Sequence, residues 1–217
     1  MPTSKDIIAA LAPLADASRA PAMRAYMRDQ FEFLGIGTPD RRAAVRPIAR
    51  ELRAAPAGEL IALAGELWEL PQREYQYAAL DILALNWRTL SAAELPPLMA
   101  LVRNKSWWDS VDGLAGIIGD ILRGDHHGMD EALAHDDFWV RRIALLHQLG
   151  WRERTDEERL FRYALAQSHE REFFIQKAIG WALRDYARHA PDAVRGFLAG
   201  PGECLAALSR REAAKHL

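Results

Sequence analysis

The stretch WVRRIALLHQL, residues 139–149, is one of four similar stretches that decide the fold. The others are YQYAALDILAL at residues 75–85, WDSVDGLAGII at residues 108–118 and FIQKAIGWALR at residues 174–184. Each opens with an aromatic residue and continues with small or aliphatic residues at helical spacing, and the leading aromatics are 33, 31 and 35 residues apart. Such a period is typical of helical-hairpin repeats, in which each unit buries its apolar face only against its neighbours.

The rest of the chain also predicts one helix after another. Strand-like alternation is absent, and N-cap residues or proline mark helix starts at Thr38, Ser91, Ser106 and Thr155. We therefore expect an all-α fold, a right-handed solenoid of helical hairpins with a concave groove lined by equivalent positions of successive repeats. A plain helical bundle is the alternative. Because there is no long linker or low-complexity tract, we expect a single domain over residues 1–217.

The composition is that of a globular protein, with 217 residues, of which 50% are hydrophobic and 27% are charged. No apolar run is long enough to cross a bilayer, and the N-terminus lacks the apolar core of a secretory signal. The single cysteine, Cys204, excludes an internal disulfide and a cysteine-based zinc site. These features predict a cytoplasmic protein without a membrane partner.

The charge balance alone argues against nucleic acid, because the formal net charge is −2. However, 24 of the 28 basic residues are arginine, the better partner for phosphate. A GC-rich genome would explain the same bias. If the protein binds DNA, its positive charge must be gathered on one face and balanced by acid elsewhere.

The segment NKSWWDSVDGLAGIIGDIL, residues 104–122, carries the first candidate site. Its core face is predicted to consist of Trp107, Val111, Leu114, Ile118 and Ile121. Trp108 and Asp112 are four residues apart, so they lie side by side about 100° away from that face. Gly116 and Gly119 continue their stripe and should leave the surface low and open. A tryptophan beside a carboxylate off the core indicates a binding or catalytic site, although a half-buried Trp beside a solvated Asp is the structural alternative.

The segment REFFIQKAIGWALRDYARHAP, residues 171–191, carries the second. Beside a core stripe, a second stripe holds three cations and one aromatic: Lys177, Trp181, Arg184 and Arg188. That pattern is typical of a surface that follows a phosphate backbone, and also of an ordinary solvated face. In the preceding repeat, Arg142 matches Lys177 and lies on a half-apolar flank, so it should snorkel or line a groove.

Other chemistry has little support in the sequence. There is no glycine-rich phosphate loop, no nucleophile elbow and no zinc-protease helix motif. The pair His126 and His127 lies in a stretch rich in Gly and Asp that predicts a loop. We therefore expect no metal and no cofactor.

Three of these segments carry a specific family resemblance. KSWWDSVD, the run from FWVRR to LLHQL, and EFFIQKAIGWALRDYA resemble the AlkD-type DNA alkylation repair enzymes, which are HEAT-like-repeat DNA glycosylases. PAMRAYMRDQFEFLGIGTPDRR and LSRREAAKH resemble the same family, so the similarity covers about residues 20–216. The resemblance implies a solenoid of HEAT-like repeats. The connection between Asp120 and Asp136 is shorter than the family pattern.

The resemblance also implies a set of site residues. The groove residues beside the lesion would be Trp108, Asp112, Arg142 and Trp181. Tyr26 matches a tyrosine that approaches the DNA backbone. With the cations Lys177, Arg184 and Arg188, these positions would bind double-stranded DNA that carries alkylated bases.

The activity that the resemblance implies is excision of N3- and N7-alkylated purines, of the 3-methyladenine and 7-methylguanine type, in base excision repair. The base would not be flipped into a pocket, and the enzyme would be monofunctional. As a hypothesis, Asp112 stabilises the cationic sugar and positions water, while Arg142 holds a phosphate. We expect a monomer without an obligate protein partner. The competing hypotheses are a non-catalytic repeat scaffold that binds DNA or protein through the same groove, and an adaptor for proteins only.

Overall fold

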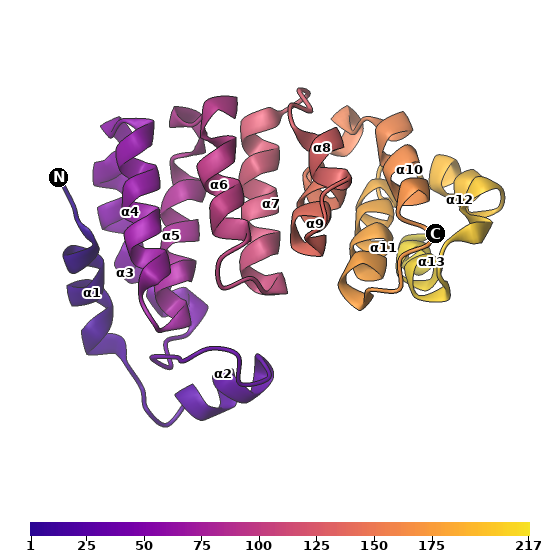
Figure 1. Ribbon diagram of the computed structural model, residues 1–217. Helices are drawn as coiled ribbons and strands as arrows, with labels where there is room; N and C mark the ends of the chain where they lie inside the picture. The colour runs from indigo at the N-terminus through magenta and orange to yellow at the C-terminus, as the bar shows by residue number, and fades with distance from the viewer. The chain divides into compact units, whose positions relative to one another are not determined.

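The computed structural model describes residues 1–217 and contains helices without a β-strand (Figure 1). The prediction of an all-α fold is confirmed. The chain forms two compact units, residues 1–104 and residues 105–217. The solenoid and the single domain stay predictions. No helix combines the length and the apolar character that a bilayer crossing requires.

The thirteen α-helices divide between the two units. The first unit contains α1 (Ser4–Leu11), α2 (Ala20–Tyr26), α3 (Thr38–Glu51), α4 (Ala57–Glu69), α5 (Arg73–Leu85) and α6 (Leu95–Val102). The second contains α7 (Trp108–Leu122), α8 (Met129–Leu133), α9 (Phe138–Leu146), α10 (Glu157–Ala166), α11 (Phe173–Ala187), α12 (Pro191–Leu198) and α13 (Ala207–Ala213). Short 3₁₀ helices are η1 (Ala12–Leu14), η2 (Leu52–Ala54), η3 (Trp87–Thr89), η4 (Ala92–Glu94), η5 (Arg152–Arg154), η6 (Pro201–Cys204) and η7 (Ala214–His216).

Helix α5 organises the first unit through two buried polar side chains. The carboxylate of Glu74 accepts hydrogen bonds from three consecutive backbone N–H groups, those of residues 34–36, at 2.9 to 3.1 Å. The amide of Gln76 donates to carbonyls at the end of α4. Because buried polar groups are costly without partners, these bonds fix the loop after α2 and the end of α4 against α5.

The four similar stretches coincide with α5, α7, α9 and α11, so their helical prediction is confirmed. Helix α9 ends three residues before the predicted stretch does, and Gly150 follows in a left-handed conformation with φ of +79°. Helix α8 has only five residues. Between α7 and α9, the short connection from Asp120 to Asp136 therefore has room for this one short helix only.

Two predicted helix starts are one residue too early. Trp107, not Ser106, is the N-cap of α7. Asp156, not Thr155, is the N-cap of α10, because its carboxylate accepts the backbone N–H of Arg159 at 3.0 Å. The predicted cap Thr38 is one residue too late, because Gly37 is the N-cap of α3 and Thr38 is its first helical residue. The predicted start at Ser91 is confirmed, since Ser91 is the N-cap of η4, which leads into α6.

Close helix contacts in the second unit depend on two glycines. A Cβ atom on Gly119 of α7 would lie 1.9 Å from the carbonyl oxygen of His147, and one on Gly180 of α11 would lie 2.5 Å from Cβ of Glu212 in α13. The prediction that Gly119 leaves an open surface was therefore wrong, since the position lets α7 and the end of α9 approach each other. At Gly116 the space is open, as predicted.

Candidate functional site

Helix α7 presents the first two predicted site residues. Trp108 is its first residue, and Asp112 follows one turn later. Both are half-buried, while Val111, Leu114 and Ile118 are at most 1% exposed. The central part of the predicted core face is thus confirmed, and Asp112 lies beside it with its side chain 21% exposed.

Asp112 forms a two-bond ion pair with Arg142 of α9. The Nε and Nη2 atoms of Arg142 donate to the two carboxylate oxygens at 2.7 and 2.8 Å. Nη1 of Arg142 donates to the backbone carbonyl of Phe174, at the start of α11. The arginine side chain is only 1% exposed. This pairing replaces the phosphate contact that we expected for Arg142, because the guanidinium is buried and already bonded on three nitrogens.

The protonation of Asp112 depends on two opposing effects. Burial raises the pKa of the Asp112 carboxyl above its usual range. The hydrogen bonds and positive charge of Arg142 oppose this rise, and the nearby charge of Asp109 adds to it. Arg142 therefore favours the ionised form of a partly buried carboxylate and also fixes its orientation.

Trp181 of α11 lies among three cations. The charged groups of Lys177, Arg142 and Arg184 lie 5.3, 5.5 and 5.6 Å from its ring centroid. Its indole nitrogen is buried without a hydrogen-bond partner, so ring contacts hold the side chain. Since Arg142 also bonds Asp112, this one arginine connects the carboxylate of α7 to the tryptophan of α11.

Glu212 of α13 gathers the cations on the other side of Trp181. Its carboxylate pairs with Lys177 and Arg184 at 3.0 Å each and with Lys215 at 2.8 Å. The hydrogen bond from Lys215 contributes most to lowering the pKa of Glu212, to about 2, and Lys177 adds to it. Three cations around one carboxylate leave this end of the site positively charged.

An aromatic layer supports the site. The rings of Trp107, Trp139 and Phe174 pack against one another with centroids 4.9 to 6.0 Å apart. The layer joins the starts of α7, α9 and α11, which are the helices that carry Asp112, Arg142 and Trp181. These tilted ring contacts help to fix the starts of the three helices relative to one another.

The structure brings together most of the predicted residues but not all of them. Asp112, Arg142, Trp181, Lys177 and Arg184 form one chain of contacts. Two predicted DNA-binding residues lie outside this chain of contacts. Arg188, in the second unit, is exposed and contacts His216. Tyr26, on α2 of the first unit, is also exposed.

Sequence reasoning missed Phe174 as the acceptor for the arginine and Glu212 as the centre of the cation cluster. The carbonyl of Phe174 is a backbone group, for which no side-chain pattern gives a signal. For Glu212, the only local signal is Lys215 three residues later on the same helical segment.

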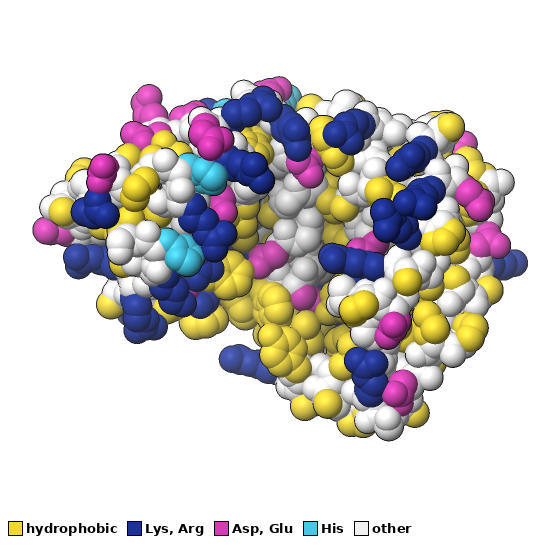
Figure 2. Space-filling model, turned by 180° about the vertical axis from the view of Figure 1, so that it is seen from behind, with side chains coloured by type: hydrophobic (Ala, Val, Ile, Leu, Met, Phe, Trp, Pro, Cys, Tyr) yellow, Lys and Arg dark blue, Asp and Glu magenta, His cyan; other side chains and the backbone are white.

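Charge is unevenly spread on the face seen in Figure 2. Lys and Arg side chains, with His among them, lie on both the upper and the lower part of the C-terminal unit, whereas Asp and Glu lie mainly along its upper edge.

His126 of the short connection packs against His147, at the end of α9. Nδ1 of His147 lies 2.7 Å from the Ala144 carbonyl and must donate to it, so Nε2 accepts from Nδ1 of His126 at 2.9 Å. Burial lowers the pKa of His147 to about 4. No group of three His, Cys, Asp or Glu side chains is arranged to hold a metal ion.

The fold and this arrangement define an all-helical protein with a partly buried carboxylate, held by arginine, beside tryptophans and cations. The family model for "DNA alkylation repair enzyme" matches residues 7–217. The chain belongs to the DNA alkylation repair enzyme family, which confirms the resemblance of its motifs.

A solved structure supports the same assignment. It is described as a predicted DNA alkylation repair enzyme from Enterococcus faecalis, and it is 33% identical to this chain with a TM-score of 0.85. The match covers 94% of this chain and 96% of that one. No curated protein matches the chain.

Proposed function

We propose that this protein is a DNA glycosylase that hydrolyses the N-glycosidic bond of cationic N3- and N7-alkylated purines in double-stranded DNA. One observation carries the proposal: Asp112 is a half-buried carboxylate whose two oxygens are fixed by Arg142 at 2.7 and 2.8 Å. Membership of an alkylation repair family supplies the class of substrate. A fixed carboxylate in a partly desolvated site is suited to stabilise positive charge that develops during a reaction.

The chemistry needs only one carboxylate because the substrate is already charged. Alkylation at N3 or N7 makes the base a cation, so the electron pair of the breaking C1′–N bond leaves with a neutral purine. A common glycosidase needs a second carboxyl to protonate its leaving group, and here that step is unnecessary. Asp112 stabilises the cationic deoxyribose, and water then adds to C1′ and loses a proton, which yields an abasic site.

The surrounding residues have separate roles in this proposal. Trp108, one turn before Asp112 on the same helix, packs against the deoxyribose. Arg142 is a positioning residue, because it contacts Asp112 and is too buried to contact DNA. The cations around Trp181 and Glu212 bind backbone phosphates, with Arg188 and Tyr26 as further contacts.

Recognition of this kind reads the sugar and phosphates and leaves the base largely in the duplex. Enzymes that flip bases bind them in a deep pocket, whereas Trp108, Asp112 and Trp181 lie on half-exposed helix faces. The side-chain nitrogen of Lys177 pairs with the carboxylate of Glu212 at 3.0 Å, so this lysine is engaged in an ion pair away from Asp112. We therefore propose hydrolysis without strand cleavage, by a monomer that acts in the cytoplasm without a metal.

The test measures release of 7-methylguanine from methylated duplex DNA. We expect Asp112→Asn to lower the single-turnover rate about 100-fold or more. Asp136→Asn, which neutralises an exposed carboxylate outside the site, is the matched control and should behave like the wild-type protein. Thermal melting of all three proteins shows that they are folded. If neither the wild-type protein nor the control releases base, a non-catalytic scaffold becomes the better interpretation.

A further inference from the structure

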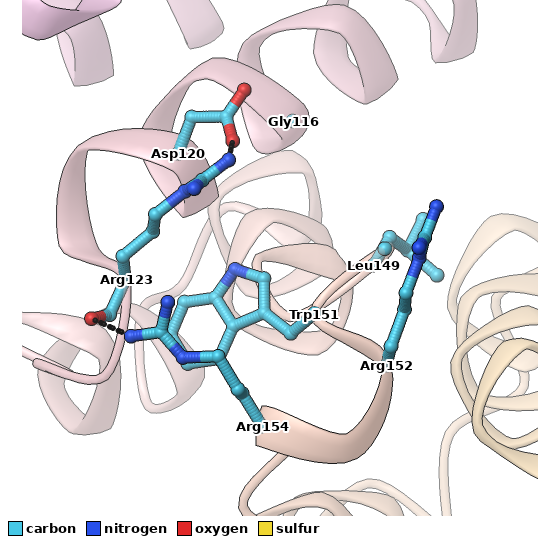
Figure 3. Close-up of a pocket in the computed structure, with 8 residues that line it drawn as sticks. Gly116, Asp120, Arg123, Leu149, Trp151, Arg152 and Arg154 are labelled. Atoms are coloured by element: carbon cyan, nitrogen blue, oxygen red, sulfur yellow. Dashed lines mark hydrogen bonds and ion pairs between the residues drawn. The ribbon is translucent and has the colours of Figure 1, made fainter. Parts of the chain in front are cut away.

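A second feature of the C-terminal unit is a pocket with a volume of about 480 Å³ (Figure 3). One wall is the last part of α7, with Gly116, Asp120 and Arg123. The other wall is the turn after α9, which contributes residues 149–152 and Arg154. None of the proposed site residues lines it.

The pocket carries excess positive charge. Arg123 is partly neutralised by Asp120, whose carboxylate lies 2.9 Å from its Nη2. The side chain of Arg154 donates only to the backbone carbonyl of Arg123, at 3.2 Å. The guanidinium of Arg152 forms no hydrogen bond or close ion pair, although its charge helps to lower the pKa of the neighbouring Glu153. Two guanidinium groups in one pocket therefore lack a carboxylate partner, which is the arrangement that suits an anion with several oxygens.

The turn that presents these arginines is fixed in place. The backbone N–H of Gly150 donates to Asp185 at 2.8 Å, and the indole N–H of Trp151 donates to the carbonyl of Gly119 at 3.2 Å. Arg152 has a φ of +60°, a left-handed conformation that is strained for a residue other than glycine. Such strain is typical of positions with a function, and here it holds Arg152 on the opposite side of Trp151 from Arg123 in Figure 3.

Two pocket residues of α7, Gly116 and Asp120, lie on the same helix face as Asp112. Gly116 lies one turn after Asp112 on α7, and no atom lies within 4 Å of where its Cβ would be. Asp120 follows one turn later, so the pocket lies within about 12 Å of Asp112 along the helix axis. At about 3.4 Å of rise per nucleotide, a DNA strand that places a sugar at Asp112 has a phosphate within a few nucleotides of this pocket.

We infer that the pocket binds a backbone phosphate of the same DNA duplex, a few nucleotides from the damaged base. Arg152 and Arg154 supply the donors, and Arg123 completes the positive wall. The inference rests on the proposed function, because it takes DNA as the ligand. It adds a contact that orients the duplex at a distance from the bond that breaks.

The first test measures how duplex affinity depends on salt. A labelled 25-base-pair duplex is titrated with the wild-type protein, Arg152→Gln, Arg154→Gln and the double variant at several salt concentrations. Each lost phosphate contact should reduce the slope of log K against log salt by about 1. Arg195→Gln on α12, an exposed arginine outside the pocket, is the matched control and should keep the wild-type slope. A double variant with the wild-type slope would overturn the inference.

The second test locates the phosphate. A single neutral methylphosphonate is moved along each strand, and affinity is measured for the wild-type protein and the double variant. We expect one position, a few nucleotides from the lesion, at which the substitution weakens binding by the wild-type protein but not by the double variant. If the two proteins respond equally at every position, the pocket does not bind the duplex.

The two proposals can fail separately. One outcome is that the wild-type protein releases 7-methylguanine while the arginine variants keep the wild-type salt slope. That result would support the glycosylase proposal and contradict the phosphate pocket. If the slopes fall as expected while no base is released, the pocket binds DNA and the protein is not a glycosylase.

Discussion

At the scale of single residues, Arg142 is the side chain that balances the charge of Asp112 in the candidate site. Its guanidinium is 1% exposed, and it bonds both oxygens of Asp112 and the carbonyl of Phe174. Removing one partner of such a buried pair leaves an uncompensated charge, which costs on the order of 3–5 kcal/mol. The pair should therefore contribute to folding as well as to activity.

The first prediction concerns the pH dependence of base release. The proposed reaction needs ionised Asp112, and burial raises the pKa of this carboxyl. The rate should therefore fall as the pH drops through a midpoint above the ordinary value for Asp, about 3.9. In Arg142→Gln the opposing hydrogen bonds and charge are lost, so the midpoint should move to higher pH. The measurement is the single-turnover rate against pH, corrected for spontaneous depurination. An unchanged midpoint in the variant would contradict the role of Arg142.

The second prediction concerns Glu212. Lys215 and Lys177 lower its pKa to about 2, so the carboxylate stabilises the folded state above its unfolded pKa, and this contribution is lost as the pH falls towards 2. Glu212→Gln should lower the free energy of unfolding by on the order of 3 kcal/mol at pH 7. Urea unfolding at several pH values checks this. The difference from the wild-type protein should shrink below about pH 4, and a constant difference would rule out the charge effect.

At the scale of helices, α7 carries two glycines with opposite environments. Gly116 faces open space, while Gly119 lies against the backbone of His147. Both look alike in sequence, because they continue the same stripe as Asp112. The difference arises from the contact with the end of α9, which no local pattern reports.

The third prediction is that alanine has opposite effects at these two positions. Gly116→Ala should stabilise the protein by about 0.5–1 kcal/mol, because alanine is the better helix former. Gly119→Ala should destabilise it by about 1–3 kcal/mol or more, because the new methyl group would lie 1.9 Å from the His147 carbonyl oxygen unless the helices separate. Thermal melting of the two variants checks the signs, and a stabilised Gly119→Ala would show that α7 and α9 do not pack closely.

The helices themselves could be predicted because their signals are local. The apolar rhythm identified α5, α7, α9 and α11, and capping residues located helix starts to within one residue at Ser106 and Thr155. The prediction ran three residues too far at the end of α9, because Leu149 continues the apolar pattern after the chain has turned.

At the scale of the whole molecule, one proposed DNA contact belongs to a different compact unit from the candidate site. Asp112, Arg142 and Trp181 belong to residues 105–217, whereas Tyr26 belongs to residues 1–104 and is 72% exposed. An exposed tyrosine that contacts DNA contributes to affinity and not to the chemistry at the sugar.

The fourth prediction tests this contact. Tyr26→Ala should raise the Kd for duplex DNA roughly tenfold, which corresponds to about 1.4 kcal/mol. Tyr26→Phe distinguishes the contribution of the hydroxyl group to affinity from that of the ring. If the hydroxyl group donates a hydrogen bond to a phosphate, Tyr26→Phe should bind DNA as weakly as Tyr26→Ala. Binding titrations at a fixed salt concentration measure both. A Kd equal to that of the wild-type protein in both variants would remove Tyr26 from the interface.

The candidate site could be predicted in its members but not in its pairings. Asp112 and Trp181 stood out because a carboxylate and an indole lay off the core face of their helices. The Asp112–Arg142 pair joins residues 30 positions apart, and Glu212 meets Lys177 across 35 positions, so both depend on how helices pack. Sequence periodicity predicts the helix face on which a residue lies. The residue with which it pairs depends on how the helices pack.

The pairing of Asp112 with its own arginine has a consequence for lesion choice. A carboxylate whose charge is already balanced exerts little long-range pull on a cationic purine, and the proposed reaction gives the departing base no proton. The relative rates at which the protein excises different adducts should then follow how readily each N-glycosidic bond breaks without the enzyme. A plot of the logarithm of the enzymatic rate against that of spontaneous depurination should be linear with a slope near one. The protein would in that case accelerate every labile adduct by a similar factor, whatever its size.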